Sequence, residues 1–314
     1  MPVSQFPFGS ATSLVRVLRQ RKVSSLELLN AYLTRIDEVN PAINAVVVQD
    51  RRAARAQARK ADEEAARGIW RGPLHGLPMT VKEAFDLKGY ATTMGYPSMT
   101  NNMAKEDALA VQRLKAAGAI VFGKSNVPVN GDIQTYNAVF GVTNNPWDLT
   151  RGAGGSSGGG AAAMAAGLSG LEYGSDIGGS IRVPAAYCGV YGHKSTWGIV
   201  PKRGHQLART PVAEADLGSL GPIARSADDL KLALQATLGP DALTGSGVRY
   251  ALPAAPKSLQ GMRIAVWLDD PMAPVDDAVK APIAAAAEAL RKAGAKVDFK
   301  ARPAFDVQQA HHTF

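Results

Sequence analysis

Two clusters of glycine and serine lie close together in the middle of the chain, at Gly154–Gly160 and Gly174–Ser180. Glycine beside serine allows sharp backbone turns, which expose the serine hydroxyl and leave successive N–H groups free to converge. A nucleophilic serine needs both properties, because it must reach a substrate and because the oxyanion that forms needs hydrogen-bond donors. One such cluster alone is typical of a loop. Two clusters separated by an alanine-rich helix and a short strand favour a catalytic site built from backbone turns.

The helices and strands expected around these clusters follow the order of an α/β protein. Ser24 and Glu27 have the spacing of a capping box before LLNAYLTRI, whose apolar residues recur at helical intervals. Further helices are predicted at 53–67, 105–117 and 275–293, and strands at 79–82, 119–124, 262–267 and 296–299. We therefore expect an α/β fold with a mixed, largely parallel central sheet flanked by helices.

The whole chain, 1–314, is expected to form a single domain with four parts. These are N-terminal helices over about 1–70, a catalytic core over about 71–235, a linker over about 237–259 and a C-terminal α/β segment over 260–314. The last residues, ARPAFDVQQAHHTF, contain no helix stop and no terminal cap. We therefore expect this last segment to continue beyond the chain end and the sheet to be incomplete.

The chain carries a formal charge of +8, but the distribution of its basic residues argues against a nucleic-acid surface. RRAARAQARK, at Arg51–Lys60, predicts one helix without interleaved aromatic residues, and an acidic DEE follows it. A solvated helix face explains this pattern. We therefore expect no nucleic-acid partner.

A single cysteine, Cys188, excludes an internal disulfide framework and a multi-cysteine metal site. It lies in the apolar run AAYCGVYG, which predicts a buried structural thiol. The histidines lack the spacing of a zinc site, and MPVSQFPFGS lacks the pattern of a signal peptide. No apolar run approaches the roughly 18 residues that a membrane span needs. We expect a cytoplasmic protein without a metal, an organic cofactor or a membrane partner.

The stretch from Gly154 to Ser195 resembles the amidase signature family, whose pattern is GGSSGG, an intervening helix and strand, and then GSDIGGSIRxPAxxCGVxGxKPT. Upstream, GPLHGLPMTVKEAFD resembles the segment that carries the family's lysine, and GKSNVP and TNNPWD are also similar. The resemblance covers most of Ser24–Pro222. The chain departs from the pattern at Glu83, where aspartate is usual, and at Ser195, where proline is usual; family members also generally extend further.

The resemblance implies an amidase that hydrolyses a carboxylic acid amide to the acid and ammonia or an amine. In that family pattern Ser180 corresponds to the nucleophile, Ser156 to a proton bridge that follows a cis peptide bond, and Lys82 to the base. The oxyanion hole would be formed by the N–H groups of Ile177, Gly178, Gly179 and Ser180. The residues expected to support the triad are Ser157, Ser175, Asp176 and Arg182, of which the last two would form a structural pair. The residues expected to line the substrate pocket are Asn130, Gly131 and Gln134.

The chemistry of Lys82 is coherent with this role. A lysine has an ordinary pKa of about 10.4 and accepts a proton only when neutral. Burial among apolar neighbours favours the neutral form and can lower the pKa by about 3–5. LPMTV precedes Lys82, and the predicted strand end would direct the side chain inward. Lys82 would then take a proton from Ser156 as Ser156 takes one from Ser180.

Two pattern matches indicate other functions. GAIVFGKS, at Gly118–Ser125, satisfies the Walker A expression, but its AIVF interval predicts a strand where a phosphate-binding loop is needed. GGSSG, at Gly154–Gly158, satisfies the G-x-S-x-G motif of an α/β-hydrolase. That alternative leaves the second cluster and Lys82 unexplained. Its candidate bases are His193, His205, His311 and His312.

Two further functions remain open. The first is the amidase subunit of a tRNA-dependent amidotransferase, which passes ammonia to a partner subunit. The second is a non-catalytic binding module that retains the fold. The partner expected for the favoured function is a small-molecule amide substrate, and a homodimer is an open option for the assembly.

Overall fold

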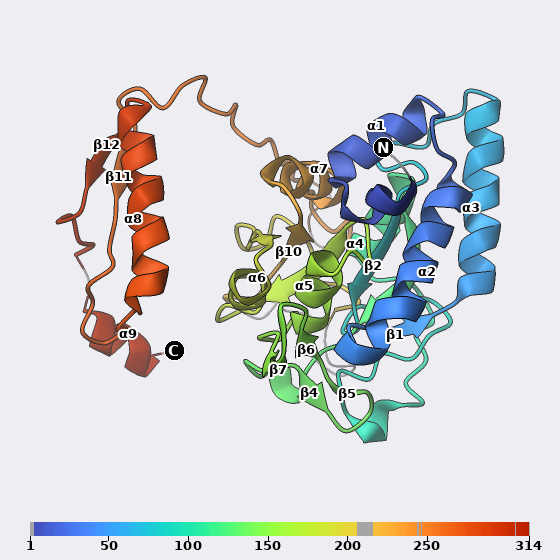
Figure 1. Cartoon of the computed structure of the whole chain (residues 1–314), viewed down its shortest axis with the longest axis horizontal. Coiled ribbons are helices and arrows are strands. Elements are labelled where there is room, and N and C mark those ends of the chain that lie inside the picture. The colour runs from blue at the N-terminus through green and yellow to red at the C-terminus, as the bar shows by residue number, and fades with distance from the viewer. Residues whose placement is uncertain (1–2, 206–215, 244, 246, 305, 314) are drawn as a thin grey trace. The chain divides into compact units, whose positions relative to one another are not determined.

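The computed structural model describes residues 3–205, 216–243, 245, 247–304 and 306–313 (Figure 1). Contacts divide the chain into two compact units, Met1–Tyr250 and Ala251–Phe314, and each is described by itself. The boundary between them falls inside the predicted linker at 237–259. The assignment of the whole chain to one domain stays a prediction.

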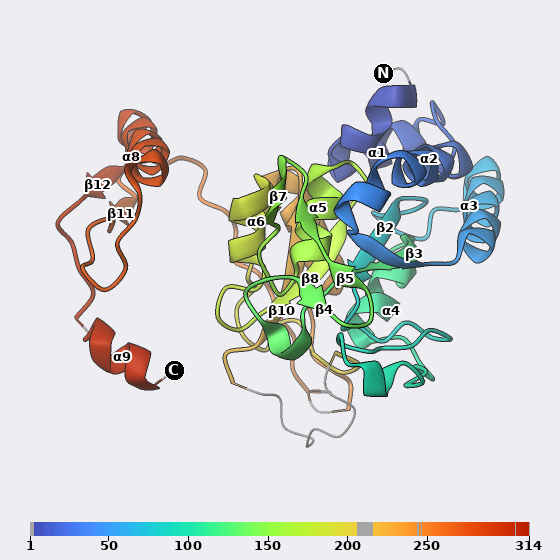
Figure 2. The same cartoon turned by 60° about the horizontal axis from the view of Figure 1, so that its bottom comes forward.

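The first unit is built on a mixed sheet of six strands in the order β1-β3-β2-β8-β10-β9 (Figures 1 and 2). Strand β2 pairs in parallel with both β3 and β8, so the centre of the sheet is parallel. Strand β1 pairs antiparallel with β3, and β10 pairs antiparallel with β8 and β9. This confirms the predicted α/β class with a mixed central sheet. The strands are β1 (Val46–Gln49), β2 (Pro78–Lys82), β3 (Ile120–Ser125), β8 (Glu172–Asp176), β9 (Tyr191–Gly192) and β10 (Ser219–Ala224).

Helices cover both faces of this sheet. On one face α5 packs so closely on β8 that a Cβ atom added to Gly160 would collide with Glu172. On the other face the Tyr173 hydroxyl of β8 is 2.6 Å from the Thr237 hydroxyl of α7. The α-helices of this unit are α1 (Ala11–Arg19), α2 (Ser25–Ile43), α3 (Arg51–Ala66), α4 (Leu109–Ala116), α5 (Gly158–Ala165), α6 (Arg182–Cys188) and α7 (Ala227–Thr237).

Short elements complete the first unit. Three 3₁₀ helices are described, and two antiparallel strand pairs precede the first glycine cluster. The 3₁₀ helices are η1 (Val3–Phe8), η2 (Pro97–Met99) and η3 (Val129–Gly131), and the paired strands are β4 (Tyr136–Asn137) with β5 (Gly141–Val142) and β6 (Asn144–Asn145) with β7 (Asp148–Gly152).

The capping box predicted at the start of α2 is present. The Ser24 hydroxyl accepts a hydrogen bond from the Glu27 N–H at 3.1 Å, and the Glu27 carboxylate accepts one from the Ser24 N–H at 2.8 Å. These two bonds satisfy N–H groups that a helix start leaves without an intrahelical partner. The sequence therefore located this helix start correctly.

The helix predicted at 105–117 begins later, at Leu109, where α4 starts. The N–H of Ala108 donates to the Asp86 carbonyl and that of Leu109 to the Arg203 carbonyl, both at 2.9 Å. Acceptors from distant segments therefore hold this part of the chain in a non-helical conformation, which local periodicity does not reveal.

The predicted strand at 119–124 is confirmed as β3, Ile120–Ser125. All six of its residues are buried, including Lys124. The interval of the Walker A match is therefore a strand in the sheet, and the loop that would hold phosphate groups is not formed.

The second unit consists of two strands and two helices. Strands β11 (Arg263–Ala265) and β12 (Lys296–Asp298) pair in parallel, and α8 (Asp277–Lys292) connects them. Helix α9 (Val307–Thr313) follows. The predicted strand-helix-strand order of this segment is confirmed. Across the described residues of both units, no helix is long and apolar enough to cross a bilayer.

Candidate active site

Lys82 lies at the end of β2, in the parallel centre of the sheet. Every residue of this strand, PMTVK, is buried, and Lys82 itself is 3% exposed. Its Nζ donates hydrogen bonds to Ser156 Oγ at 2.6 Å and to Ser175 Oγ at 3.0 Å. The strand end directs the amine inward, as the sequence predicted, and its hydrogen-bond partners come from both Gly-Ser clusters.

Ser156 lies in a turn immediately before α5. The Gly155–Ser156 peptide bond is cis, as the family resemblance implied. A Cβ atom added to Gly155 would collide with the carbonyl oxygen of Asp132, so only glycine fits there. The first cluster therefore brings the backbone close to a neighbouring loop and presents the Ser156 hydroxyl to the Lys82 amine.

Ser180 lies in the turn between β8 and α6 and is half-buried. Its carbonyl oxygen accepts a hydrogen bond from the Ser157 N–H at 3.0 Å, which joins the two clusters through their backbones. Within the part of the chain that the structure describes, the Ser180 hydroxyl makes no hydrogen bond. The role of this hydroxyl as the nucleophile stays a prediction.

The four predicted oxyanion donors differ in their present partners. The Gly179 N–H donates to Asp176 Oδ1 at 2.8 Å, so it is already engaged. The N–H groups of Ile177, Gly178 and Ser180 have no acceptor among the described residues. Of the four predicted donors, one is thus engaged and three have no partner in the described part of the chain; their role as an oxyanion hole stays a prediction.

Asp176 organises this turn. Its carboxylate accepts from the N–H groups of Gly179 and Ile181 and from the Arg182 guanidinium, with nitrogen–oxygen distances of 2.9 and 3.0 Å to the guanidinium. Burial opposes ionisation of Asp176, but Arg182 and the two N–H groups outweigh it and lower its pKa to about 2. Lys194 Nζ also donates to the Asp176 carbonyl at 2.8 Å. The predicted pair of Asp176 and Arg182 is present.

The electrostatics of Lys82 suit a proton acceptor. Burial lowers the pKa of Lys82 to about 7, against the opposing charges of Asp176 and Glu172. A buried amine is poorly solvated as a cation, so the neutral form is favoured. Near neutral pH a substantial fraction of Lys82 is therefore able to accept a proton.

Two serines predicted to support the triad have different partners. The Ser175 hydroxyl accepts the second hydrogen bond from Lys82. The Ser157 hydroxyl donates to the Ser175 carbonyl at 3.3 Å, and Ser157 is the N-cap residue immediately before α5. Ser175 therefore contacts the lysine directly, whereas Ser157 holds the two clusters together.

The three predicted pocket residues are not equally close to the triad. A Cβ atom added to Gly131 would lie 4.0 Å from Ser156 Oγ, so Gly131 borders the site. Asn130 accepts a hydrogen bond from the Tyr96 hydroxyl. The Gln134 side chain lies against Gly152. A role of these residues in substrate binding stays a prediction.

His193 and His205, two of the candidate bases of the alternative hydrolase arrangement, lie in the first unit with the serine clusters. Neither His193 nor His205 hydrogen-bonds to a serine of either cluster in the described ranges. His205 is half-buried with its ring 4.4 Å from that of Phe85, and desolvation lowers its pKa to about 3. Cys188 is also buried, and burial raises its pKa to about 12. No cluster of three or more metal-ligating side chains occurs among the described residues.

Sequence reasoning missed a buried carboxyl group beside the triad. Glu172, on β8, is fully buried and accepts hydrogen bonds from the hydroxyls of Thr80 and Ser125. The only signal was one glutamate in an otherwise uncharged segment, GLSGLEYG, which leads into the second cluster. Its two partners come from other strands, so the local sequence does not identify them.

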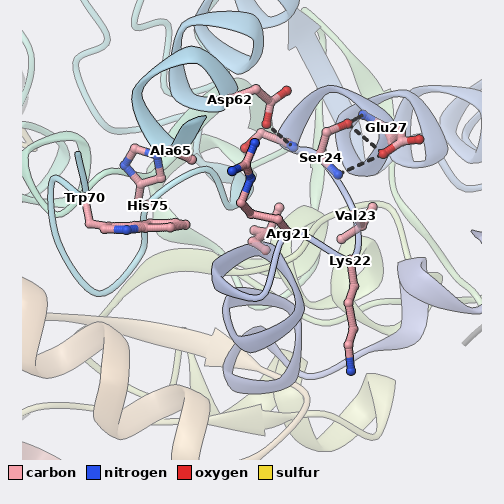
Figure 3. A pocket seen from close by; sticks show the side chains of 11 residues that line it. Arg21, Lys22, Val23, Ser24, Glu27, Asp62, Ala65, Trp70 and His75 are labelled. Carbon is pink, nitrogen blue, oxygen red and sulfur yellow. Dashed lines mark hydrogen bonds between the residues drawn. The ribbon is translucent and has the colours of Figure 1, made fainter. Parts of the chain in front are cut away.

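The first unit also contains a pocket that lies away from the candidate active site. It has a volume of about 370 Å³ and is lined by residues of α1, α2 and α3, with Trp70 and His75 (Figure 3). Asp62 accepts from the N–H groups that begin α2, and both ring nitrogens of His75 face backbone partners. These polar groups hold the helices together. The pocket shares no residue with the candidate active site.

Comparisons with known proteins identify the family of the chain. Residues 27–310 match the Amidase family. The chain is 40% identical to a subunit of the glutamyl-tRNA(Gln) amidotransferase of Roseiflexus castenholzii, over 94% of this chain and 60% of that protein. It is 37% identical to an acylamidase of Rhodococcus erythropolis, over 92% of this chain and 60% of that protein. A solved bacterial aryl acylamidase superposes with a TM-score of 0.87 at 28% identity, over 97% of this chain and 64% of that one.

The superposition on the bacterial aryl acylamidase and the match to the Amidase family define a class of α/β hydrolytic enzymes. The chain belongs to that class as a member of the amidase signature family. It spans about 60% of the length of the curated relatives that it matches.

Proposed function

We propose that this chain is an amidase that hydrolyses a carboxylic acid amide through an acyl-enzyme on Ser180. The observation that carries the proposal is the 2.6 Å contact between Lys82 Nζ and Ser156 Oγ, buried at the junction of the two clusters. A buried lysine beside a serine supplies a base without a histidine. The proposed substrate is a small-molecule amide, the proposed location is the cytoplasm, and no cofactor is invoked.

The first half of the reaction forms the acyl-enzyme. Neutral Lys82 accepts the proton of Ser156, and Ser156 accepts the proton of Ser180 as the Ser180 oxygen bonds to the amide carbon. The carbonyl oxygen becomes an oxyanion, which the free N–H groups of the Ile177–Ser180 turn stabilise. The relay then returns a proton to the nitrogen, the carbon–nitrogen bond breaks, and ammonia or an amine leaves.

The second half releases the acid. Water attacks the acyl carbon of the ester on Ser180, and its proton passes to the relay. The same N–H groups stabilise the second oxyanion. The bond between the acyl carbon and Ser180 then breaks, the serine oxygen regains a proton from Ser156, and the carboxylic acid is released.

The test is hydrolysis of a panel of aliphatic and aryl amides together with labelling by a fluorophosphonate probe. Ser180→Ala is expected to abolish both turnover and labelling, because the attacking oxygen is removed. Ser195→Ala is the matched control: it deletes a buried hydroxyl that donates to the Leu220 carbonyl outside the relay. Full activity in Ser180→Ala would refute the proposal.

A second candidate is the amidase subunit of a tRNA-dependent amidotransferase. Two curated relatives of 40% and 38% identity are named as subunits of such an enzyme, while the acylamidase stands at 37%, so identity alone does not separate the two functions. Glutaminase activity and copurification with a partner subunit would favour this candidate. A non-catalytic binding module would instead fail to react with the fluorophosphonate probe at any pH.

A further inference from the structure

Glu172 is a buried acid that the proposed relay does not use. It is 0% exposed and lies on β8. The Thr80 hydroxyl donates to one of its carboxyl oxygens and the Ser125 hydroxyl to the other, the latter at 3.1 Å. A buried carboxyl group with two hydroxyl donors is placed specifically, because an unsatisfied buried acid would be costly.

The strand registers place this acid on the same face of the sheet as Lys82. Thr80 is the neighbour of Glu172 across β2 and β8, and Ser125 is the neighbour of Lys82 across β2 and β3. Thr80 and Lys82 are two residues apart on β2, so their side chains leave the sheet on one side. The hydroxyls of Thr80 and Ser125 therefore connect Glu172 to the part of the face that carries Lys82.

Lys82 is the charged group that faces Glu172. Helix α5, which packs directly on Glu172, and strand β10, the other neighbour of β8, contain no titratable residue. Lys124 of β3 is paired with Glu83, 3.5 Å away. The charges of Asp176 and Glu172 raise the pKa of Lys82, and the charge of Lys82 lowers the pKa of the half-buried His205. Among the described residues, Glu172 and Asp176 are thus the acids that influence Lys82.

We propose that Glu172 is a positioning residue whose buried carboxyl group controls how tightly Lys82 holds its proton, and thereby the pH range in which Ser180 is activated. An ionised Glu172 stabilises the Lys82 cation, so Lys82 gives up its proton only at a higher pH. Without that negative charge the attraction is lost, and Lys82 becomes a base at a lower pH. This role deepens the proposed function and rests on it.

The ionisation of both groups supports the proposal. Burial raises the pKa of Glu172 to about 7, although Thr80 and Ser125 act in the opposite direction by stabilising the carboxylate. Burial brings the pKa of Lys82 down to about 7 as well. The charge of each group therefore changes in the pH range where the other titrates, so the two are coupled.

The experiment compares the wild-type chain with Glu172→Gln and Tyr173→Phe. The rate of Ser180 labelling by a fluorophosphonate probe is measured across pH. In Glu172→Gln the acidic midpoint is expected to move to lower pH by about 1 unit, because one nearby negative charge is lost. Tyr173→Phe is the matched control, since it deletes a buried hydroxyl on the opposite face of β8 without changing charge. Its midpoint is expected to equal that of the wild type.

A second measurement follows Lys82 without using reactivity. In protein labelled with ¹³C at lysine Cε, the Lys82 signal is assigned through Lys82→Met and titrated by NMR. Glu172→Gln is expected to lower its midpoint. Thr80→Val removes a hydrogen-bond donor that favours ionised Glu172, so it is expected to lower the Lys82 midpoint by a smaller amount. If Glu172→Gln does not fold, Thr80→Val alone tests the role of Glu172.

The outcomes separate this inference from the proposed function. An unchanged Lys82 midpoint in the folded variants overturns the role of Glu172, even when Ser180 reacts normally. A wild-type chain that is never labelled at any pH refutes the proposed function and the role of Glu172 with it. A lowered Lys82 midpoint together with a shifted labelling profile supports both.

Discussion

The amine of Lys82 lies 2.6 Å from the hydroxyl of Ser156, although 74 residues separate them in the chain. Strand β2 ends at the lysine, and the turn before α5 presents the serine. Because β2 lies between β3 and β8, the amine reaches this turn from inside the sheet and is removed from water. The fold thus creates the environment in which a lysine can act as a base.

Replacing Lys82 tests this contact directly. Lys82→Met keeps an unbranched side chain but removes the proton acceptor, so kcat/KM for amide hydrolysis is expected to fall by about 10²–10⁴-fold. Raising the pH is not expected to repair the loss, since methionine has no group to deprotonate. Lys88→Met, which changes an exposed lysine, is the control. Comparable losses in both variants would remove the assigned role of Lys82.

The pH profile of hydrolysis follows from the same residue. Burial lowers the pKa of Lys82 to about 7, and only the neutral amine accepts a proton. The neutral fraction rises with pH, so kcat/KM is expected to increase tenfold per pH unit below about 7 and to level above it. The measurement is kcat/KM across pH in buffers of constant ionic strength. A profile that stays flat down to about pH 5 would contradict a neutral lysine base.

Local signals in the sequence were enough for most of the fold. The capping box of Ser24 and Glu27 located the start of α2, and the apolar AIVF run located β3. The start of α4 was misplaced, because the carbonyls of Asp86 and Arg203 take the N–H groups of Ala108 and Leu109. Such bonds from distant segments leave no trace in the periodicity of a single stretch.

The candidate site was only partly predictable. Family similarity singled out Lys82 and Ser156, which the structure brings into hydrogen-bonding contact. It did not reveal that the Gly179 N–H already binds Asp176. Nor did it reveal Glu172, because the burial of one glutamate depends on hydroxyl donors from two other strands. Partner assignments of this kind require the strand order and the register.

Asp176 is expected to matter for both activity and acid stability. Asp176→Asn keeps one oxygen acceptor but loses the charge that holds Arg182, so the turn before Ser180 loosens and fluorophosphonate labelling slows. The pKa of Asp176 is lowered from 3.8 to about 2, so its contribution to folding is present above about pH 4 and is lost as pH falls through about 2. The difference in stability between wild type and variant should therefore shrink over that range.

Chemical denaturation at a series of pH values measures this difference. Asp148→Asn serves as the control, because Asp148 is a partly exposed carboxylate whose partners are its own neighbours Thr150 and Arg151. Labelling of Ser180 should be unaffected by it. A stability difference for Asp176→Asn that stays constant from about pH 7 to about pH 2 would show that the charge of Asp176 does not stabilise the fold.

The buried pair of Glu83 and Lys124 gives the last prediction, which concerns stability. The two side chains are 0% exposed and 3.5 Å apart, and Glu83 also accepts the N–H groups of Thr93 and Met94. Glu83→Gln leaves the Lys124 cation buried without its counter-charge, so the free energy of unfolding is expected to fall by about 3–5 kcal/mol. Adding Lys124→Met removes the unpaired charge and should recover part of the loss.

Urea denaturation measures the free energy of unfolding of these variants. The control is Glu64→Gln, which breaks the more exposed pair of Glu64 with Arg71 and is expected to cost at most about 1 kcal/mol. Equal costs for Glu83→Gln and Glu64→Gln would mean that Lys124 is stabilised by its contact with the Ala91 carbonyl and does not need the carboxylate.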